Sequence, residues 1–217
     1  MVRRFRNFAN TLLTCRLMTA LPTDVELWIS LKQGNREAFT ALYGKYSKML
    51  FSYGLRITPD EHVVADALQS TFVKFWTNRE TIALPVQVKP FLITSFRNNL
   101  STIIAKGNRT ESLDNFNEEQ FVMNFTLESE YIKKEDVDIQ SKKLNDALNQ
   151  LSPRQKEIIY LRYFEELDYN EIAAIMDISV KGAYKLSARA LFSLQKIMEI
   201  GRNGLFLMLA AYRISHF

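Results

Sequence analysis

Apolar side chains recur at three- and four-residue spacing along most of the chain, and strict alternation is rare. This spacing gathers apolar side chains on one face of an α-helix, so the pattern predicts an all-α protein. The clearest stripe in the first half of the chain comprises Phe39, Leu42, Tyr43, Tyr46, Met49, Leu50 and Tyr53.

A second helix is predicted just after this stripe. Thr58 can cap it, Pro59 fits the first helical position and Glu61 can complete a capping box. A third helix is predicted over residues 91–106, after a loop bracketed by prolines. We expect these helices to form a first domain, residues 22–107.

The polar and acidic residues 108–139 indicate a flexible linker, and residues 140–200 then predict a second helical domain. The apolar tail, residues 201–217, is too short to cross a bilayer. We expect it to pack on the second domain, although binding to a partner or to a membrane surface is also open. Helices of the second domain are predicted to start at the caps Ser152, Asp168 and Ser179.

Charge is unevenly distributed. Lys and Arg total 28 and Asp and Glu 24, but four arginines lie among the first twenty residues, so the body of the chain is neutral. Residues 86–109 and 178–198 are basic and free of acids, and the stretch between them, residues 111–138, is mostly acidic. This arrangement favours a long polyanion contacted at two places, although solvated helix faces explain it equally well.

Several function classes are disfavoured by composition. One cysteine, Cys15, cannot form an internal disulfide, which fits a reducing, cytoplasmic setting. With only His62 and His216 besides, no metal site or cofactor is expected. Residues 1–21 are interpreted as an N-terminal extension in which Met18 is the natural start.

Residues 171–190 are typical of a helix-turn-helix. Small Ala173 allows two helices to cross closely, and Ser179 can cap a second helix that fits the DNA major groove. An ordinary helical hairpin with a solvated basic face is the alternative. The side chains expected to face DNA are Lys181, Tyr184, Lys185 and Arg189.

Residues 148–173 resemble region 4 of the extracytoplasmic function (ECF) group of sigma-70 family RNA polymerase sigma factors, in particular its Bacteroidetes-like members. Residues 38–46, 66–76 and 90–100 resemble region 2 of the same family, in the family's order and spacing. The resemblance implies a region 2 bundle and a region 4 helix-turn-helix, joined by the flexible acidic linker. It also implies transcription initiation without catalytic chemistry.

The resemblance further implies three partners: core RNA polymerase, through its largest-subunit coiled-coil and its flap, promoter DNA, and an anti-sigma factor that is possibly membrane-anchored. Region 4 would read the minus-35 element through the helix-turn-helix residues. Region 2 would bind core polymerase through Asp66, Gln69, Ser70, Val73, Lys74 and Trp76. It would contact and melt the minus-10 element through the loop at residues 77–89 and through Arg97, Asn98, Asn99, Lys106 and Arg109.

Simpler structural roles are open for several of these residues. Val73 and Trp76 could be plain core, and Asn98 or Asn99 could merely cap or solvate a helix. The chain also departs from the family pattern, with Asp177 where the turn commonly has glycine. The recognition helix departs from the family pattern at two further positions. Gly182 stands where the family often has threonine, and Leu186 stands where it often has arginine.

Two other function classes fit the sequence less well. A stand-alone helix-turn-helix regulator with a sensory N-terminal domain has no reason to carry the region 2 pattern at residues 66–76. A helical enzyme is disfavoured because the sequence has no glycine-rich phosphate loop, no nucleophile with a nearby base and no clustered ligands.

Overall fold

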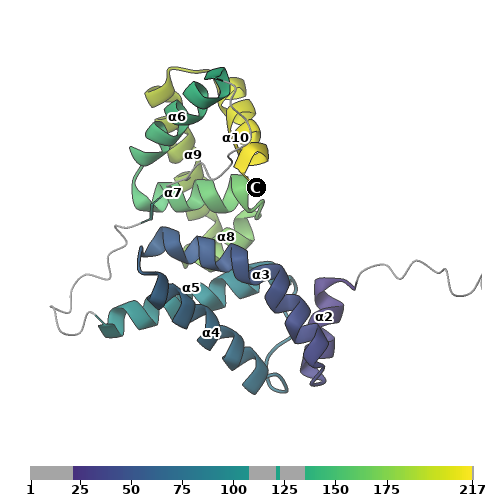
Figure 1. The fold of residues 1–217 in the computed structure, drawn as a ribbon. Helices are drawn as coiled ribbons and strands as arrows, with labels where there is room; N and C mark the ends of the chain where they lie inside the picture. The colour runs from purple at the N-terminus through teal and green to yellow at the C-terminus, as the bar shows by residue number, and fades with distance from the viewer. Residues whose placement is uncertain (1–21, 108–120, 123–134, 217) are drawn as a thin grey trace, which may run out of the picture.

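The computed structural model describes residues 22–107, 121–122 and 135–216, and all regular structure within them is helical. The all-α prediction is confirmed, and the helices form two stacked bundles (Figure 1). The first bundle contains α2 (Asp24–Lys32), α3 (Arg36–Ile57), α4 (Glu61–Thr77) and α5 (Val88–Gly107). The second contains α6 (Glu135–Asn149), α7 (Pro153–Ile159), the π-helical turn η2 (Tyr160–Phe164), α8 (Tyr169–Met176), α9 (Val180–Met198) and α10 (Arg202–His216).

An aromatic cluster holds the first bundle together and also positions the loop before α5. Trp28 of α2 is fully buried, with its ring 5.5 Å from that of Phe75 and 5.4 Å from that of Phe91, both edge-on. Its indole Nε1 donates to the Ala83 carbonyl at 3.3 Å, and Lys32 Nζ donates to the Ile82 carbonyl. The loop between α4 and α5 is therefore tied to α2.

Most predicted helix starts are confirmed, but α4 begins differently. Asp60, rather than Thr58, is its cap, because the Asp60 carboxylate accepts from the backbone N–H groups of His62 and Val63. Thr58 is extended, as the residue before a proline prefers, and it ends α3. The caps Ser152, Asp168 and Ser179 are confirmed.

Two other boundaries differ from expectation. Helix α5 begins at Val88, so that Pro90 lies in the first turn, where its missing N–H costs no hydrogen bond. Helix α6 begins at Glu135, inside the segment expected as linker. Residues 1–21, with the expected start at Met18, lie outside the described residues.

The second bundle contains the helix-turn-helix as α8 and α9. Asp177 closes α8 in the left-handed conformation, with φ 52° and ψ 53°, where the family commonly has glycine. Its backbone N–H donates to the Ala173 carbonyl. Asp177 therefore makes the turn that the sequence predicted.

The C-terminal helix packs on the second bundle, as expected for the tail. Leu205 and Leu209 of α10 are buried, and the Phe206 ring lies 6.0 Å from that of Tyr163 in η2. No helix among the described residues has the length and apolar character needed to cross a bilayer.

The approach of α3 to its neighbours generates a stability prediction. A Cβ on the buried Gly54 would lie 2.7 Å from Val64 Cγ1 and 2.9 Å from Phe96 Cζ. Gly54→Ala should therefore lower the free energy of unfolding by about 1–3 kcal/mol, measured by urea denaturation.

Gly44 on the same helix provides the matched control, because a Cβ there meets nothing within 4 Å. Gly44→Ala should be neutral or raise the free energy of unfolding by up to ~1 kcal/mol, through helix propensity alone. Equal effects of the two substitutions would contradict the packing described for Gly54.

Candidate nucleic-acid interface

The four side chains predicted to face DNA from the second bundle share one exposed surface of α9. Lys181, Tyr184, Lys185 and Arg189 are all exposed. The opposite side of α9 is buried in the bundle, and the first turn carries no acidic residue. The helix thus presents three cations and an aromatic ring to solvent, a combination suited to phosphates and base edges. The buried side of α9 comprises Ala183, Ser187, Ala190 and Leu194.

Tyr184 is supported by a neighbour that sequence reasoning missed. The ring of Tyr169, from α8, lies 3.9 Å from the Tyr184 ring. The Tyr169 hydroxyl is 3.1 Å from Ser187 Oγ, and the Arg162 guanidinium lies 5.0 Å from the Tyr169 ring. Tyr169 therefore links α8 to two positions of α9. No sequence signal distinguishes it from any other aromatic residue next to a cap.

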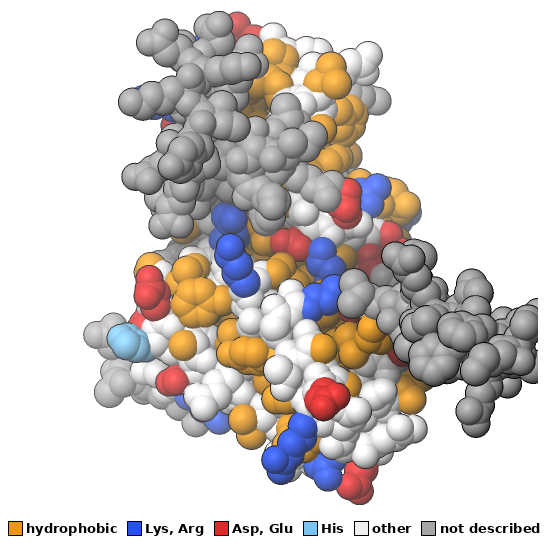
Figure 2. Space-filling view, turned by 45° about the vertical axis from the view of Figure 1, so that its right-hand side comes forward, with side chains coloured by type: hydrophobic (Ala, Val, Ile, Leu, Met, Phe, Trp, Pro, Cys, Tyr) orange, Lys and Arg blue, Asp and Glu red, His pale blue; other side chains and the backbone are white. Residues whose placement is uncertain are grey.

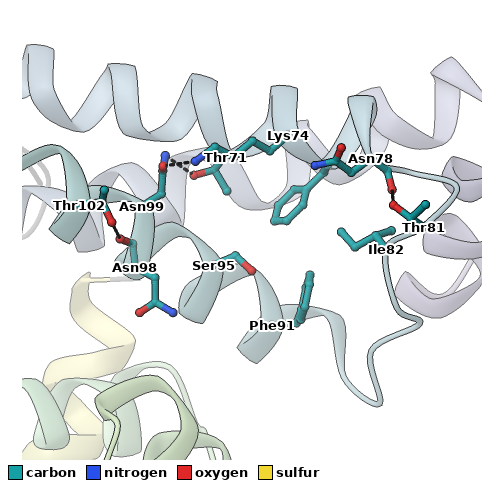
Figure 3. A pocket seen from close by; sticks show the side chains of 11 residues that line it. Thr71, Lys74, Asn78, Thr81, Ile82, Phe91, Ser95, Asn98, Asn99 and Thr102 are labelled. Atoms are coloured by element: carbon teal, nitrogen blue, oxygen red, sulfur yellow. Dashed lines mark hydrogen bonds between the residues drawn. The ribbon is translucent and has the colours of Figure 1, made fainter.

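A pocket of about 450 Å³ opens between α4, the following turn and α5 in the first bundle (Figure 3). Asn78, Thr81 and Ile82 line it from the turn. Hydroxyl and amide groups therefore stand beside aromatic rings around one opening. The lining residues from the two helices are Thr71, Lys74, Phe75, Phe91, Ser95, Asn98, Asn99 and Thr102.

The adjacent residues Asn98 and Asn99 have different surroundings. Asn98 is exposed at the pocket. Asn99 joins α5 to α4: its Nδ2 donates to the Ala67 carbonyl at 3.0 Å and to Ser70 Oγ at 2.6 Å, with Thr71 Oγ1 at 3.1 Å. Its Oδ1 accepts from Lys74 Nζ at 2.6 Å. Asn99 is thus a connecting residue, whereas the Asn98 amide is available to a ligand.

Two of the cations predicted for the same interface, Arg97 and Lys106, do not line this pocket. Arg97 turns toward the second bundle, where its Nε lies 2.9 Å from Glu157 Oε1 of α7. Lys106 is exposed near the end of α5, and Arg109 lies outside the described residues. Of the predicted minus-10 residues that the structure describes, the pocket therefore brings together Asn98 and Asn99 with Asn78, Thr81 and Ile82 of the predicted loop.

Arg97 belongs to a buried polar cluster between the bundles. Tyr53 donates its hydroxyl to Glu157 Oε1 at 2.6 Å. Burial raises the pKa of Tyr53 well above its usual value, and the Glu157 charge raises it further. Burial lowers the pKa of Arg97, but the Glu157 charge and Tyr53 outweigh it, so this pKa lies above its ordinary value. Tyr53 is therefore neutral and Arg97 charged at physiological pH.

The residues predicted to bind core polymerase lie along α4. Asp66, Gln69, Val73 and Lys74 are exposed. The side chain of Val73 is 54% exposed, so the interpretation of Val73 as plain core is wrong. Ser70 and Trp76 are partly buried.

These two partly buried residues have packing roles. Ser70 accepts from Asn99, while the Trp76 ring lies 5.3 Å from that of Phe39 and 5.0 Å from the Arg79 guanidinium. The four exposed residues form the accessible face of α4.

Comparisons with known proteins agree with this geometry. The family model described as "Sigma-70, region 4" matches residues 141–192, which include α8 and most of α9. The ECF RNA polymerase sigma factor SigM of Bacillus subtilis (strain 168) is 24% identical over 162 residues, covering 75% of this chain and 96% of that protein.

Two solved structures share the fold. CnrH, solved in complex with the cytosolic domain of CnrY, matches with a TM-score of 0.54 and 18% identity, covering 81% of this chain and 97% of that chain. The sigma factor RpoE of Bartonella quintana, solved with the anti-sigma factor NepR, matches with a TM-score of 0.54 and 22% identity. The match covers 76% of this chain and 98% of that chain.

The match at residues 141–192 identifies the helix-turn-helix as a sigma-70 region 4, and the similarity to SigM, a sigma factor, extends over most of the chain. The curated relative that the chain matches is an ECF sigma factor, and the two solved structures, at 18% and 22% identity, show the shared fold. The resemblance to ECF sigma factors inferred from the sequence is confirmed, while the resemblance to Bacteroidetes-like members stays a prediction.

The contrast between the two asparagines leads to a second prediction. Asn99→Ala removes the side-chain hydrogen bonds that join α5 to α4, and should lower the free energy of unfolding by about 1–3 kcal/mol in urea denaturation. Asn98→Ala should change it by less than about 0.5 kcal/mol, because that side chain is exposed. An equal loss of stability in the two variants would contradict these separate roles.

Proposed function

We propose that this chain binds core RNA polymerase and directs promoter-specific transcription initiation, reading the minus-35 element with α9 and the minus-10 element with the pocket between α4 and α5. The observation that carries the proposal is the pairing of an exposed basic recognition helix with a polar pocket on a separate bundle of one chain. The chain contributes binding rather than catalysis, and acts in the cytoplasm with the polymerase.

The minus-35 contact is supported by the shape and charge of α9. A single helix fits the major groove of B-DNA, which is roughly 12 Å wide. Lys181, Lys185 and Arg189 can contact phosphates or guanine edges, and the Tyr184 hydroxyl can donate to a phosphate oxygen. Because no acidic residue lies in the first turn, the positive end of the helix dipole also favours DNA.

The minus-10 contact is supported by the polar and aromatic lining of the pocket. A base extruded from the duplex needs hydrogen bonds at its edge and an apolar surface beside its ring. Asn98 offers both a donor and an acceptor, and Phe75 and Phe91 line the same pocket. The ties from α2 to Ala83 and Ile82 hold the loop beside it. The pocket is therefore preformed, which lowers the entropic cost of holding a base.

Two protein partners complete the proposal. Core polymerase binds the exposed face of α4, where Val73 offers apolar surface beside the polar Asp66 and Gln69, and the polymerase flap receives region 4. An anti-sigma factor holds the chain inactive. Support for this last partner comes from the related structures, which contain the cytosolic domain of CnrY and the anti-sigma factor NepR.

A run-off transcription assay tests the proposal. Purified chain added to core RNA polymerase on genomic fragments should produce discrete transcripts whose upstream sequences share two elements. Failure to co-migrate with core polymerase, or co-migration without a specific transcript, would refute it. DNA binding without polymerase association would favour the stand-alone regulator instead.

Variants of α9 should separate DNA binding from polymerase binding. On a promoter found in that assay, Lys185→Ala or Arg189→Ala should weaken promoter binding about tenfold or more, because each side chain contributes a contact to a phosphate or guanine. Association with core polymerase, measured by native gel or surface plasmon resonance, should be unchanged.

Val73→Asp is the reciprocal control. It places a charge on the exposed apolar position of α4, and should weaken polymerase association without unfolding the bundle. If the α9 variants instead lose polymerase association, the assignment of polymerase binding to α4 and of minus-35 binding to α9 is wrong.

A further inference from the structure

The two bundles meet across a pair of buried ionic contacts. Glu157 of α7 receives Arg97 Nε at 2.9 Å and Nη2 at 3.4 Å. Glu165, just after η2, receives Lys89 Nζ at 2.8 Å. The two carboxylate side chains are only 6% and 5% exposed. Figure 2 shows basic and acidic side chains next to one another at the level where the bundles meet.

Both carboxylates belong to the second bundle and both cations to the first. A buried carboxylate is costly unless it is paired, and these two take their cations from α5. The Tyr53 and Tyr160 hydroxyls donate to the same two carboxylates, at 2.6 Å and 2.5 Å. Separation of the bundles would therefore leave Glu157 and Glu165 in need of water.

An aromatic cluster closes the same interface. Tyr53 of α3 stacks on Tyr160 of η2 with 5.9 Å between ring centroids, and Phe121, from the segment that joins the bundles, lies 6.0 Å from Tyr53 and 5.9 Å from Tyr160. The Arg56 guanidinium lies 4.6 Å from the Tyr160 ring. The closed arrangement thus has an apolar centre beside its ion pairs.

The two captured cations adjoin the proposed minus-10 site. Arg97 directly precedes Asn98, which lines the pocket, and Lys89 begins α5 beside the loop. A phosphate offers a guanidinium or an ammonium group the same chemistry as a carboxylate, namely paired anionic oxygens. One set of cations therefore has two possible ligands.

We propose that Arg97 and Lys89 form one surface with two mutually exclusive occupants: Glu157 and Glu165 in the closed chain, and the phosphates of single-stranded DNA in an opened chain. This inference rests on the proposed function for its nucleic-acid ligand. Since the cations of α9 are exposed in the closed arrangement, closure blocks the single-strand surface and leaves the duplex surface accessible.

The full-length variant Glu157→Gln/Glu165→Gln tests the proposal. It keeps side-chain size and removes both charges that hold the cations. The distance between the bundles is measured by fluorescence energy transfer between cysteines placed at the exposed Gly44 of α3 and Lys196 of α9, in a Cys15→Ser background. The binding probes are a mixed-sequence single-stranded oligodeoxynucleotide and the corresponding duplex.

The variant should show a longer distance between the labels and bind the single strand about tenfold tighter, with a steeper salt dependence, because more phosphate contacts form. Duplex binding should change less than twofold. Adding Arg97→Gln and Lys89→Gln should abolish the gain in single-strand affinity. Unchanged distance and unchanged single-strand affinity in the first variant would overturn the proposal.

Net charge is controlled by Asp146→Asn/Glu199→Gln, which removes two exposed carboxylates from the second bundle. This control should behave as the parent chain. If this control gains as much single-strand affinity as Glu157→Gln/Glu165→Gln, the change in net charge alone explains the gain, and the proposal is overturned.

A charge exchange decides the question if the first variant fails to fold. Glu157→Arg alone should open the chain by repelling Arg97, and Glu157→Arg with Arg97→Glu should close it again. Failure of the second change to restore the short distance would overturn the proposal. Since the distances need neither polymerase nor promoter, they can fail while run-off transcription succeeds, or succeed while it fails.

Discussion

The pairing of Glu157 with Arg97 governs how the two halves of this molecule are arranged. A carboxylate this deeply buried needs a cation, and its cation comes from α5 of the other bundle. The Tyr53 hydroxyl of α3 donates to the same Glu157 oxygen that accepts from Arg97 Nε, so three helices meet at this contact. These polar contacts lie beside the apolar centre formed by Tyr53, Tyr160 and Phe121. The arrangement of the bundles is thus specific in geometry, and its opening is the step proposed above.

The same interface separates the surfaces proposed to contact DNA into two classes. On α9, the cations are exposed whether or not the bundles are in contact. On α5, Arg97 and Lys89 are engaged by the second bundle, while the neighbouring pocket is open. On the proposed function, a duplex and a melted strand would therefore meet this chain under different conditions.

The pocket depends on packing some distance from its own opening. Trp28 belongs to α2, which contributes none of the lining residues, yet it holds the loop before α5 through the Ala83 carbonyl. Asn99 ties α5 to α4 from the other side. Because both supports are hydrogen bonds with defined geometry, the pocket is shaped before any ligand arrives.

The amino-acid sequence by itself predicted most of the helices, the caps Ser152, Asp168 and Ser179, and the outward face of α9. These features depend on residues within one or two turns, as in the capping box of Ser152 and Gln155. The cap of α4 was misplaced because the extended Thr58 before Pro59 ends one helix instead of starting the next. Only the tertiary structure decided the roles of Arg97 and Asn99. Their partners lie far away in the chain, with 60 residues separating Arg97 from Glu157 and 32 separating Asn99 from Ala67. Local pattern carries no information about such partners, since long-range packing alone brings them within hydrogen-bond distance.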